Sequence, residues 1–165
     1  MLTRYNGNLH ASIMFIAEAP GRLGADRTGI PLHGDQTGDN FERLLRHVGL
    51  TRKDLFITNA VLCNPREESG VNGRPTTDEL KKCLSYLRQT IELVAPKIVA
   101  TLGAVALMAL DLIEEHSLVL SSGVAKPVAW YGRTLFPLYH PSPRVFVYRT
   151  RYQQEKDFEK LILLK

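Results

Sequence analysis

Four polar side chains stand where predicted strands end, and their types suit acid–base chemistry on a polar ligand. Glu18 follows an apolar run at residues 13–17, and Asp35 lies in the glycine-rich loop after it. Asn59 and His140 come at the ends of later apolar runs. Carboxylates and imidazoles transfer protons, and an amide presents a donor and an acceptor together, which suits the edge of a nucleobase. In an open α/β sheet, strand-end residues converge on one crevice, where ligands bind.

The loop after the first apolar run is rich in glycine. Its glycines include Gly24, Gly29, Gly34 and Gly38. Glycine lets a backbone turn sharply and approach a ligand closely, so we interpret this segment as a ligand-binding loop. The alternative is a solvated connection that needs its glycines only to turn. The sequence lacks a nucleophile elbow, a phosphate loop with Gly-Lys-Ser/Thr and paired histidines, so those common kinds of site are not indicated.

Apolar runs and helix signals alternate along the chain. The predicted strands are 13–17, 55–61, 97–102, 128–131 and 133–139, and the predicted helices are 39–49, 76–95, 103–113 and 150–164. Asp39 is expected to cap the first helix, and Thr76 with Glu79 has the spacing of a capping box. The last helix is expected to turn Tyr152, Phe158, Leu161 and Ile162 inward. This order predicts one α/β domain over residues 1–165, a three-layer α/β/α sandwich with a mostly parallel central sheet.

The composition is that of a globular protein with a weak basic excess. Of 165 residues, 44% are hydrophobic and 23% charged, and the net charge is +4. No apolar run approaches the ~20 residues of a membrane span and no secretory signal is recognisable, so we expect a cytoplasmic protein without a membrane partner. Basic and aromatic residues mingle near the C-terminus, namely Arg133, Arg144, Arg149 and Arg151 with Tyr139, Phe146, Tyr148 and Tyr152. This cluster is either a nucleic-acid surface or an exposed face with an apolar underside.

Five segments in series resemble the uracil-DNA glycosylase superfamily, with the strongest likeness to its families 4 and 5. They are AEAPG at 17–21, TGIPLHGDQTG at 28–38, ITNAVLCNP at 57–65, RPTTDELKKC at 74–83 and HPSPR at 140–144. The resemblance covers nearly the whole chain. It implies a monofunctional DNA glycosylase that extrudes uracil, or a related deaminated or modified base, and hydrolyses its N-glycosidic bond in base excision repair. The implied partner is DNA, duplex or single-stranded, and we expect a monomer.

The resemblance also implies roles for individual residues. Glu18 matches a family-4 glutamate, Asp35 matches a family-5 aspartate implicated in catalysis, and His140 matches the histidine that supports the departing base. Which of the two acids orients water and which stabilises the sugar cation is left open. The implied base-binding residues are Asn59, Leu32, His33, Ala19, Pro20 and Gly21. The implied DNA-binding residues are Pro141, Ser142, Pro143, Arg144, Asn72 and Arg74.

Two departures from the family pattern bear on substrate and cofactor. Leu32 stands where the families place a base-stacking Phe, so a bulky modified base in foreign DNA is an alternative substrate, and a catalytically weak damaged-DNA-binding module is an alternative function. The families hold a [4Fe–4S] cluster on four cysteines, of which Cys63 and Cys83 match the second pair and the first pair is missing. Either the cluster has been lost or the chain start is incomplete. Because two thiolates are too few for a cluster, we predict no cofactor and no metal site.

These predictions depend on one spatial expectation. Asp35 and His140 must meet across a slot for a single extruded base. Otherwise His140 is only a turn histidine bonded to backbone, Asn59 an ordinary cap, and Glu18 a strand-end carboxylate paired with an arginine.

Overall fold

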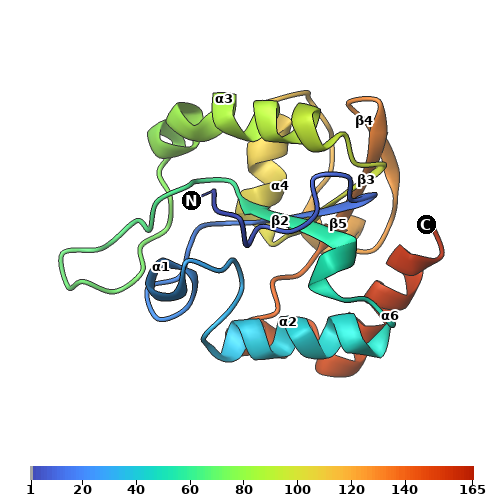
Figure 1. Cartoon of the computed structure of the whole chain (residues 1–165), viewed down its shortest axis with the longest axis horizontal. Coiled ribbons are helices and arrows are strands. Elements are labelled where there is room, and N and C mark those ends of the chain that lie inside the picture. The colour runs from blue at the N-terminus through green and yellow to red at the C-terminus, as the bar shows by residue number, and fades with distance from the viewer. Residues whose placement is uncertain (1) are drawn as a thin grey trace.

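A computed structural model describes residues 2–165 (Figure 1). In chain order its elements are β1 (Ile13–Ala17), α1 (Ala25–Thr28), α2 (Gln36–His47), η1 (Arg52–Asp54), β2 (Leu55–Asn59), α3 (Thr77–Val94), β3 (Ile98–Leu102), α4 (Ala104–Asp111), α5 (Leu120–Gly123), β4 (Val128–Trp130), β5 (Arg133–Leu138), η2 (Pro143–Val147) and α6 (Arg151–Ile162). Within the described range, no helix combines the length and apolar character needed to traverse a lipid bilayer.

The strands form one five-stranded sheet in the order β2-β1-β3-β5-β4. All neighbouring pairs are parallel except β4 with β5, which is antiparallel. In the β1–β2 register Ala17 lies opposite Asn59, so the residues that follow these two strands emerge at the same edge of the sheet. The predicted fold class, with its mostly parallel sheet, is confirmed.

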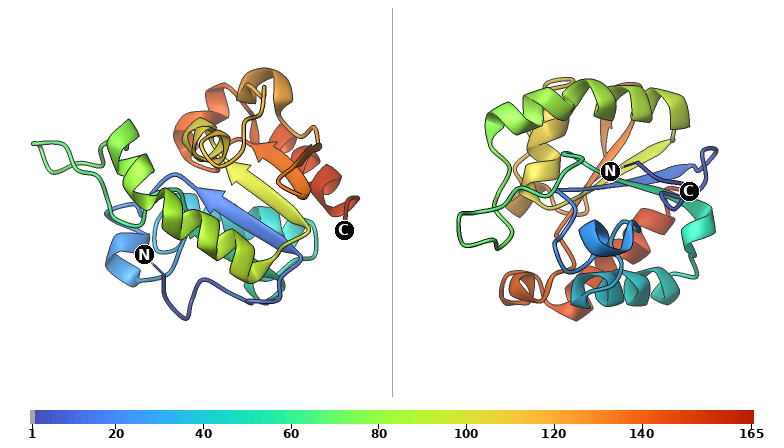
Figure 2. Two further views of the ribbon diagram at one scale, coloured as in Figure 1. Left: turned by 90° about the horizontal axis from the view of Figure 1, so that it is seen from above. Right: turned by 60° about the vertical axis from the view of Figure 1, so that its left-hand side comes forward.

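Side chains alternate between the two faces of the sheet and build two cores. Met14 and Ile16 of β1 belong to a core that includes residues of α3 and α4. Ile13, Phe15 and Ala17 belong to the opposite core, which includes residues of α2 and α6. Figures 1 and 2 show α3 and α4 on one side of the sheet and α2 and α6 on the other. Because β1 is covered on both faces, all five of its residues are buried, as the unbroken apolar run indicates.

Two local predictions are wrong. Helix α2 begins at Gln36, because Asp35 and not Asp39 is its N-cap: a side-chain oxygen of Asp35 accepts a hydrogen bond from the Gly38 backbone N–H at 2.9 Å. Both aspartates precede the same apolar stripe, so the pattern alone does not distinguish them. In α6, Phe158 and Leu161 are buried as predicted, but Tyr152 is 67% exposed, since the buried face of the helix consists of Gln154, Asp157, Phe158 and Leu161 and Tyr152 does not lie on it.

Candidate active site

The ends of β1 and β2 bring Glu18 and Asn59 to one edge of the sheet. The backbone N–H of Ala60 donates to the Ala17 carbonyl at 2.8 Å, and that of Val61 donates to the Glu18 carbonyl at 3.1 Å. These bonds continue the parallel pairing past Asn59, whose side chain is only 3% exposed. Within residues 2–165, nothing accepts a hydrogen bond from its buried Nδ2. An unsatisfied buried donor costs ~1–3 kcal/mol, and a ligand that accepts a hydrogen bond from Asn59 would remove this cost.

Asp35 lies against the start of the glycine loop. A Cβ atom placed on Gly24 would stand 2.6 Å from Oδ2 of Asp35, and one on Gly21 would stand 3.5 Å from the same oxygen. Because these two glycines lack a Cβ atom, there is space for the Asp35 carboxylate beside them. Its other oxygen, Oδ1, accepts from the Gly38 N–H. This hydrogen bond and the positive end of the α2 helix dipole, which the carboxylate faces, together hold the Asp35 side chain in place.

His140 follows β5 and lies close enough to Asp35 to respond to its charge. Burial lowers the pKa of the imidazole from 6.5 to about 4, and the negative charge of Asp35 opposes part of that shift. A Cβ atom on Gly103 would stand 3.5 Å from the Cβ of His140, so the end of β3 also adjoins this histidine. The histidine is therefore neutral near pH 7 and can donate a hydrogen bond from one ring nitrogen.

The turn that contains His140 is tied to α2 by a residue that the sequence analysis missed. Nδ2 of the buried Asn40 donates to the Pro141 carbonyl at 2.9 Å, across 101 positions of sequence. Asn40 lies on the same helix that Asp35 caps. This bond helps to hold His140 and Asp35 in register, and a single polar residue within a helix gave no sequence signal for it.

Glu18 and the loop at 64–75 form the other side of the candidate site. Burial raises the pKa of the Glu18 carboxyl, and the positive charge of Arg74 opposes that shift. Oδ1 of Asn72 accepts from the Arg22 N–H at 2.9 Å. The loop projects from the sheet in Figure 1, yet these contacts return Asn72 and Arg74 to the glycine loop. No ion pair of Glu18 with an arginine is present within residues 2–165, so the alternative of a strand-end carboxylate paired with an arginine is not seen, and Arg74 acts on Glu18 through its charge alone.

In the predicted base-binding loop, the side chains of the neighbouring residues Leu32 and His33 lie in different environments. Leu32 has a φ of +49° and a side chain that is buried in the core beside α2, whereas His33 is exposed. Arg52, a second residue without a sequence signal, holds this loop: its Nη1 donates to the Pro31 carbonyl at 2.8 Å and its Nη2 to the Leu32 carbonyl at 2.7 Å. Glu42 forms an ion pair with the same guanidinium. Of the remaining predicted base-binding residues, Pro20 is buried and Ala19 is partly buried against the α3 side of the sheet.

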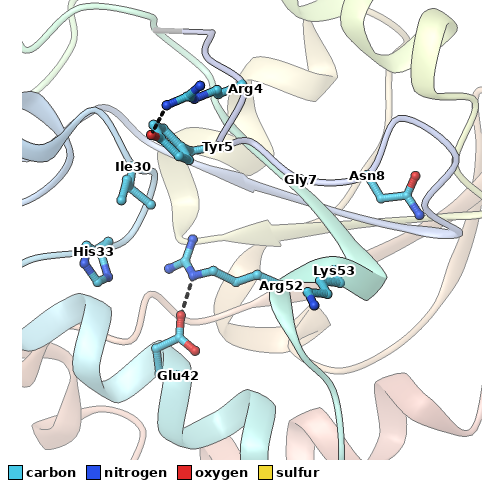
Figure 3. Close-up of a pocket in the computed structure, with 9 residues that line it drawn as sticks. All are labelled: Arg4, Tyr5, Gly7, Asn8, Ile30, His33, Glu42, Arg52 and Lys53. Carbon is cyan, nitrogen blue, oxygen red and sulfur yellow. Dashed lines mark hydrogen bonds and ion pairs between the residues drawn. The ribbon is translucent and has the colours of Figure 1, made fainter.

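Two cavities lie outside the Asp35–His140 pair. A groove of about 590 Å³ lies between the N-terminal segment and α2, and among the predicted site residues only His33 lines it (Figure 3). A smaller cavity of about 190 Å³ lies beside α4 and includes His116. The slot expected between Asp35 and His140 corresponds to neither of these cavities.

The C-terminal basic cluster divides into parts with different roles. Arg149 donates to both carboxylate oxygens of the buried Asp157, which makes it a structural residue. Arg133 begins β5, at the end of that strand remote from His140. Arg144 is exposed in η2, and Arg151 lies 4.9 Å from the Phe146 ring centroid. Only the part next to the HPSPR turn therefore remains a candidate DNA surface.

The described residues do not fit an iron–sulfur cluster. Both cysteines are free, with Cys63 exposed and Cys83 partly buried. Across residues 2–165, no group of three or more His, Cys, Asp or Glu side chains is arranged to hold a metal ion. A four-thiolate cluster cannot be completed from this donor set.

Comparison with known proteins shows the family of this chain. Residues 5–162 match the model of the "Uracil DNA glycosylase superfamily". A type-4 uracil-DNA glycosylase of Archaeoglobus fulgidus is 32% identical over 94% of this chain and 77% of its own length, and one of Saccharolobus solfataricus is 35% identical over 94% and 72%. A type-5 uracil-DNA glycosylase of Pyrobaculum aerophilum is 32% identical over 83% of this chain and 64% of its own. With the family model matched over nearly all of its length, this chain belongs to the uracil-DNA glycosylase superfamily.

Proposed function

We propose that this protein is a monofunctional DNA glycosylase that extrudes uracil from DNA and removes it by hydrolysis, acting in base excision repair. The observation that carries the proposal is the unpaired, buried Nδ2 of Asn59 beside Glu18 at the carboxyl edge of the sheet. Uracil presents a carbonyl oxygen next to an imide N–H, and the Asn59 amide has the matching donor and acceptor. Cytosine presents the opposite pattern there and would leave the amide unsatisfied.

In the proposed reaction the C1′–N1 bond breaks, and its electron pair stays on the base. Water adds to C1′ of the sugar and gives up a proton to a carboxylate. His140, neutral because its pKa is about 4, donates a hydrogen bond to the base carbonyl oxygen, where negative charge develops. A preorganised donor of this kind is typically worth ~3–4 kcal/mol in the transition state.

The two acids take different parts in this proposal. Burial raises the pKa of Glu18, which makes it the better proton acceptor for the attacking water. Asp35, held by the Gly38 N–H and facing His140, stabilises the positive charge that develops on the sugar. Neither acid, nor His140, offers an amine that could displace the base, which supports hydrolysis by water.

DNA is proposed to bind across the same edge of the sheet. The turn at residues 140–144 offers Ser142 and Arg144 to the phosphates, while Asn72 and Arg74 approach from the opposite loop. In this proposal Ala19, Pro20, Gly21 and His33 line the base, while Leu32 supports their loop from the core. We further propose that the protein acts as a cytoplasmic monomer. We also propose that it acts without an iron–sulfur cluster, because the described residues supply only two thiolates.

A glycosylase panel tests the proposal. Wild type, His140→Ala, Asp35→Asn and Glu18→Gln are assayed on single-stranded and duplex oligonucleotides that contain uracil, hypoxanthine or xanthine. We expect cleavage of uracil and a loss of at least ~100-fold in each variant, since a positioned acid or base contributes ~10²–10⁴-fold. Loss of the acidic limb of the pH–rate profile in Glu18→Gln, but not in Asp35→Asn, would identify Glu18 as the general base. Cleavage of none of these bases by folded wild type would refute the proposal and favour a DNA-binding module.

A further inference from the structure

A groove on the outer edge of the sheet adjoins the base-binding loop but has no part in the reaction proposed above. Residues 6–8 run antiparallel to β2: Gly7 forms a bridge with Phe56, and the Ile57 N–H donates to the Asn6 carbonyl at 2.7 Å. The side chain of Thr3 donates to the Gly29 carbonyl at 3.0 Å. These bonds fix the N-terminal segment as one wall of the groove of about 590 Å³.

The opposite walls come from the catalytic side of the molecule. Ile30 and His33 belong to the loop that also carries Asp35, and Figure 3 shows both across the groove from Asn8 and Lys53. Arg52 crosses the floor and is bonded to the carbonyls of that same loop. The groove therefore adjoins the loop of the candidate active site through His33, two residues before Asp35.

The charges in the groove favour an anion. Arg52 is neutralised by its ion pair with Glu42. Arg4 and Lys53 remain as cations, and no residue in the described range 2–165 forms an ion pair with either. Two cations without ion-pair partners in the lining of the groove suit phosphate groups.

The groove also offers rings on which a base can stack. Tyr5 is 46% exposed, and the Arg4 guanidinium lies 4.9 Å from its ring centroid and donates to its hydroxyl at 2.7 Å. The exposed imidazole of His33 provides a second flat surface. Cations that follow a backbone, together with rings that face bases, are the combination by which proteins bind single-stranded nucleic acid.

We propose that this groove binds one or two unpaired nucleotides of the DNA strand that carries the extruded base, with a base stacked on Tyr5 and phosphates near Arg4 and Lys53. The proposal rests on the proposed function, because it is the base at the candidate active site that brings the strand to His33. A base paired in a duplex cannot stack on Tyr5. The groove therefore gives the enzyme a preference for uracil in single-stranded DNA.

The test compares kcat/KM for uracil in single-stranded and in duplex DNA of one sequence. Tyr5→Ala should lower the single-stranded value about tenfold, within the range expected for one stacked base, and should lower the duplex value much less. Tyr5→Phe keeps the ring and should restore the wild-type ratio. Tyr86→Ala, which removes an exposed tyrosine on α3, is the matched control and should leave the ratio unchanged.

Equal losses on the two substrates, or no loss on either, would overturn the proposal. Lys53→Glu is an independent probe, because it should weaken binding of a single-stranded oligonucleotide and reduce the salt dependence of that binding. If wild type cleaves no uracil substrate, the function proposed above fails. Fluorescence anisotropy with an uncleaved single-stranded oligonucleotide then still tests whether the groove binds DNA. Unchanged affinity in Tyr5→Ala and Lys53→Glu would overturn the groove proposal, and a loss of affinity in both variants would support it.

Discussion

Acidification should destabilise this protein through His140 in a pH range where an ordinary histidine would have little effect. The pKa of the imidazole is about 4 in the folded protein, against 6.5 for the free side chain. Above pH 6.5 both the folded and the unfolded chain hold the ring neutral, so the full stability is present. Between pH 6.5 and about 4 the unfolded chain binds a proton that the folded chain does not, and the free energy of unfolding falls as the pH falls.

The size of this effect follows from the pKa difference. At about 1.4 kcal/mol per pH unit, the interval from 6.5 to about 4 corresponds to roughly 3 kcal/mol at the acid end. This is an upper limit, because His140 is only partly buried. Such a loss is a substantial fraction of the ~5–15 kcal/mol that stabilises a domain of this kind.

Urea unfolding between about pH 7.5 and about pH 4.5 measures the effect, with His140→Gln beside wild type. Glutamine does not titrate, so the variant should lose less stability over this range than wild type does. His10→Gln replaces an exposed histidine and should follow wild type. A slope in His140→Gln equal to that of wild type, or an NMR titration of the His140 ring near pH 6.5, would refute the reasoning.

Three further substitutions test the contacts around the site. Asp35→Asn retains an acceptor for the Gly38 N–H, so the free energy of unfolding should change by less than ~1 kcal/mol. Cleavage should nevertheless fall at least ~100-fold, because the negative charge is lost. Parallel unfolding and activity assays thus distinguish the role of Asp35 as a helix cap from the role of its charge. Gly24→Ala puts a methyl group 2.6 Å from Oδ2 of Asp35 and should lower cleavage about tenfold with an unchanged circular dichroism spectrum; undiminished activity would show that the carboxylate has room to move. Arg52→Lys loses the pair of hydrogen bonds to the carbonyls of Pro31 and Leu32. It should lower the free energy of unfolding by about 1–2 kcal/mol in thermal unfolding and raise KM for DNA. Wild-type values for both would mean that the loop keeps its conformation without Arg52.

The elements with strong local signals agree with the structure. The capping box at Thr76 and Glu79 starts α3, as the spacing predicts. The apolar run at residues 13–17 becomes a strand buried on both faces. These features depend on neighbours in sequence, since caps act within one turn and a strand buried on both faces needs a continuous apolar run.

The candidate site shows where local signals end. The sequence indicates that Glu18, Asn59 and His140 follow strands, and parallel strands bring such residues to one edge. It gives no sign of the bond from Asn40 to Pro141 or of the clamp of Arg52 on its loop, because each joins residues far apart in the chain through side chains that suit many positions. Leu32, predicted to face a base, instead packs into the core, since its backbone adopts φ +49° and carries the side chain inward.

The sequence by itself determined the fold class, the strand-end positions of the polar residues and the order of the family-like segments. Those properties follow from periodicity, caps and motif order, which are local. Only the tertiary structure decided which aspartate caps α2, that burial keeps His140 neutral while Asp35 stands within reach of its charge, and that the N-terminal segment closes a cationic groove along β2. Solvation and charge at a site depend on everything packed around it, and that environment comes from segments separated by as much as a hundred residues.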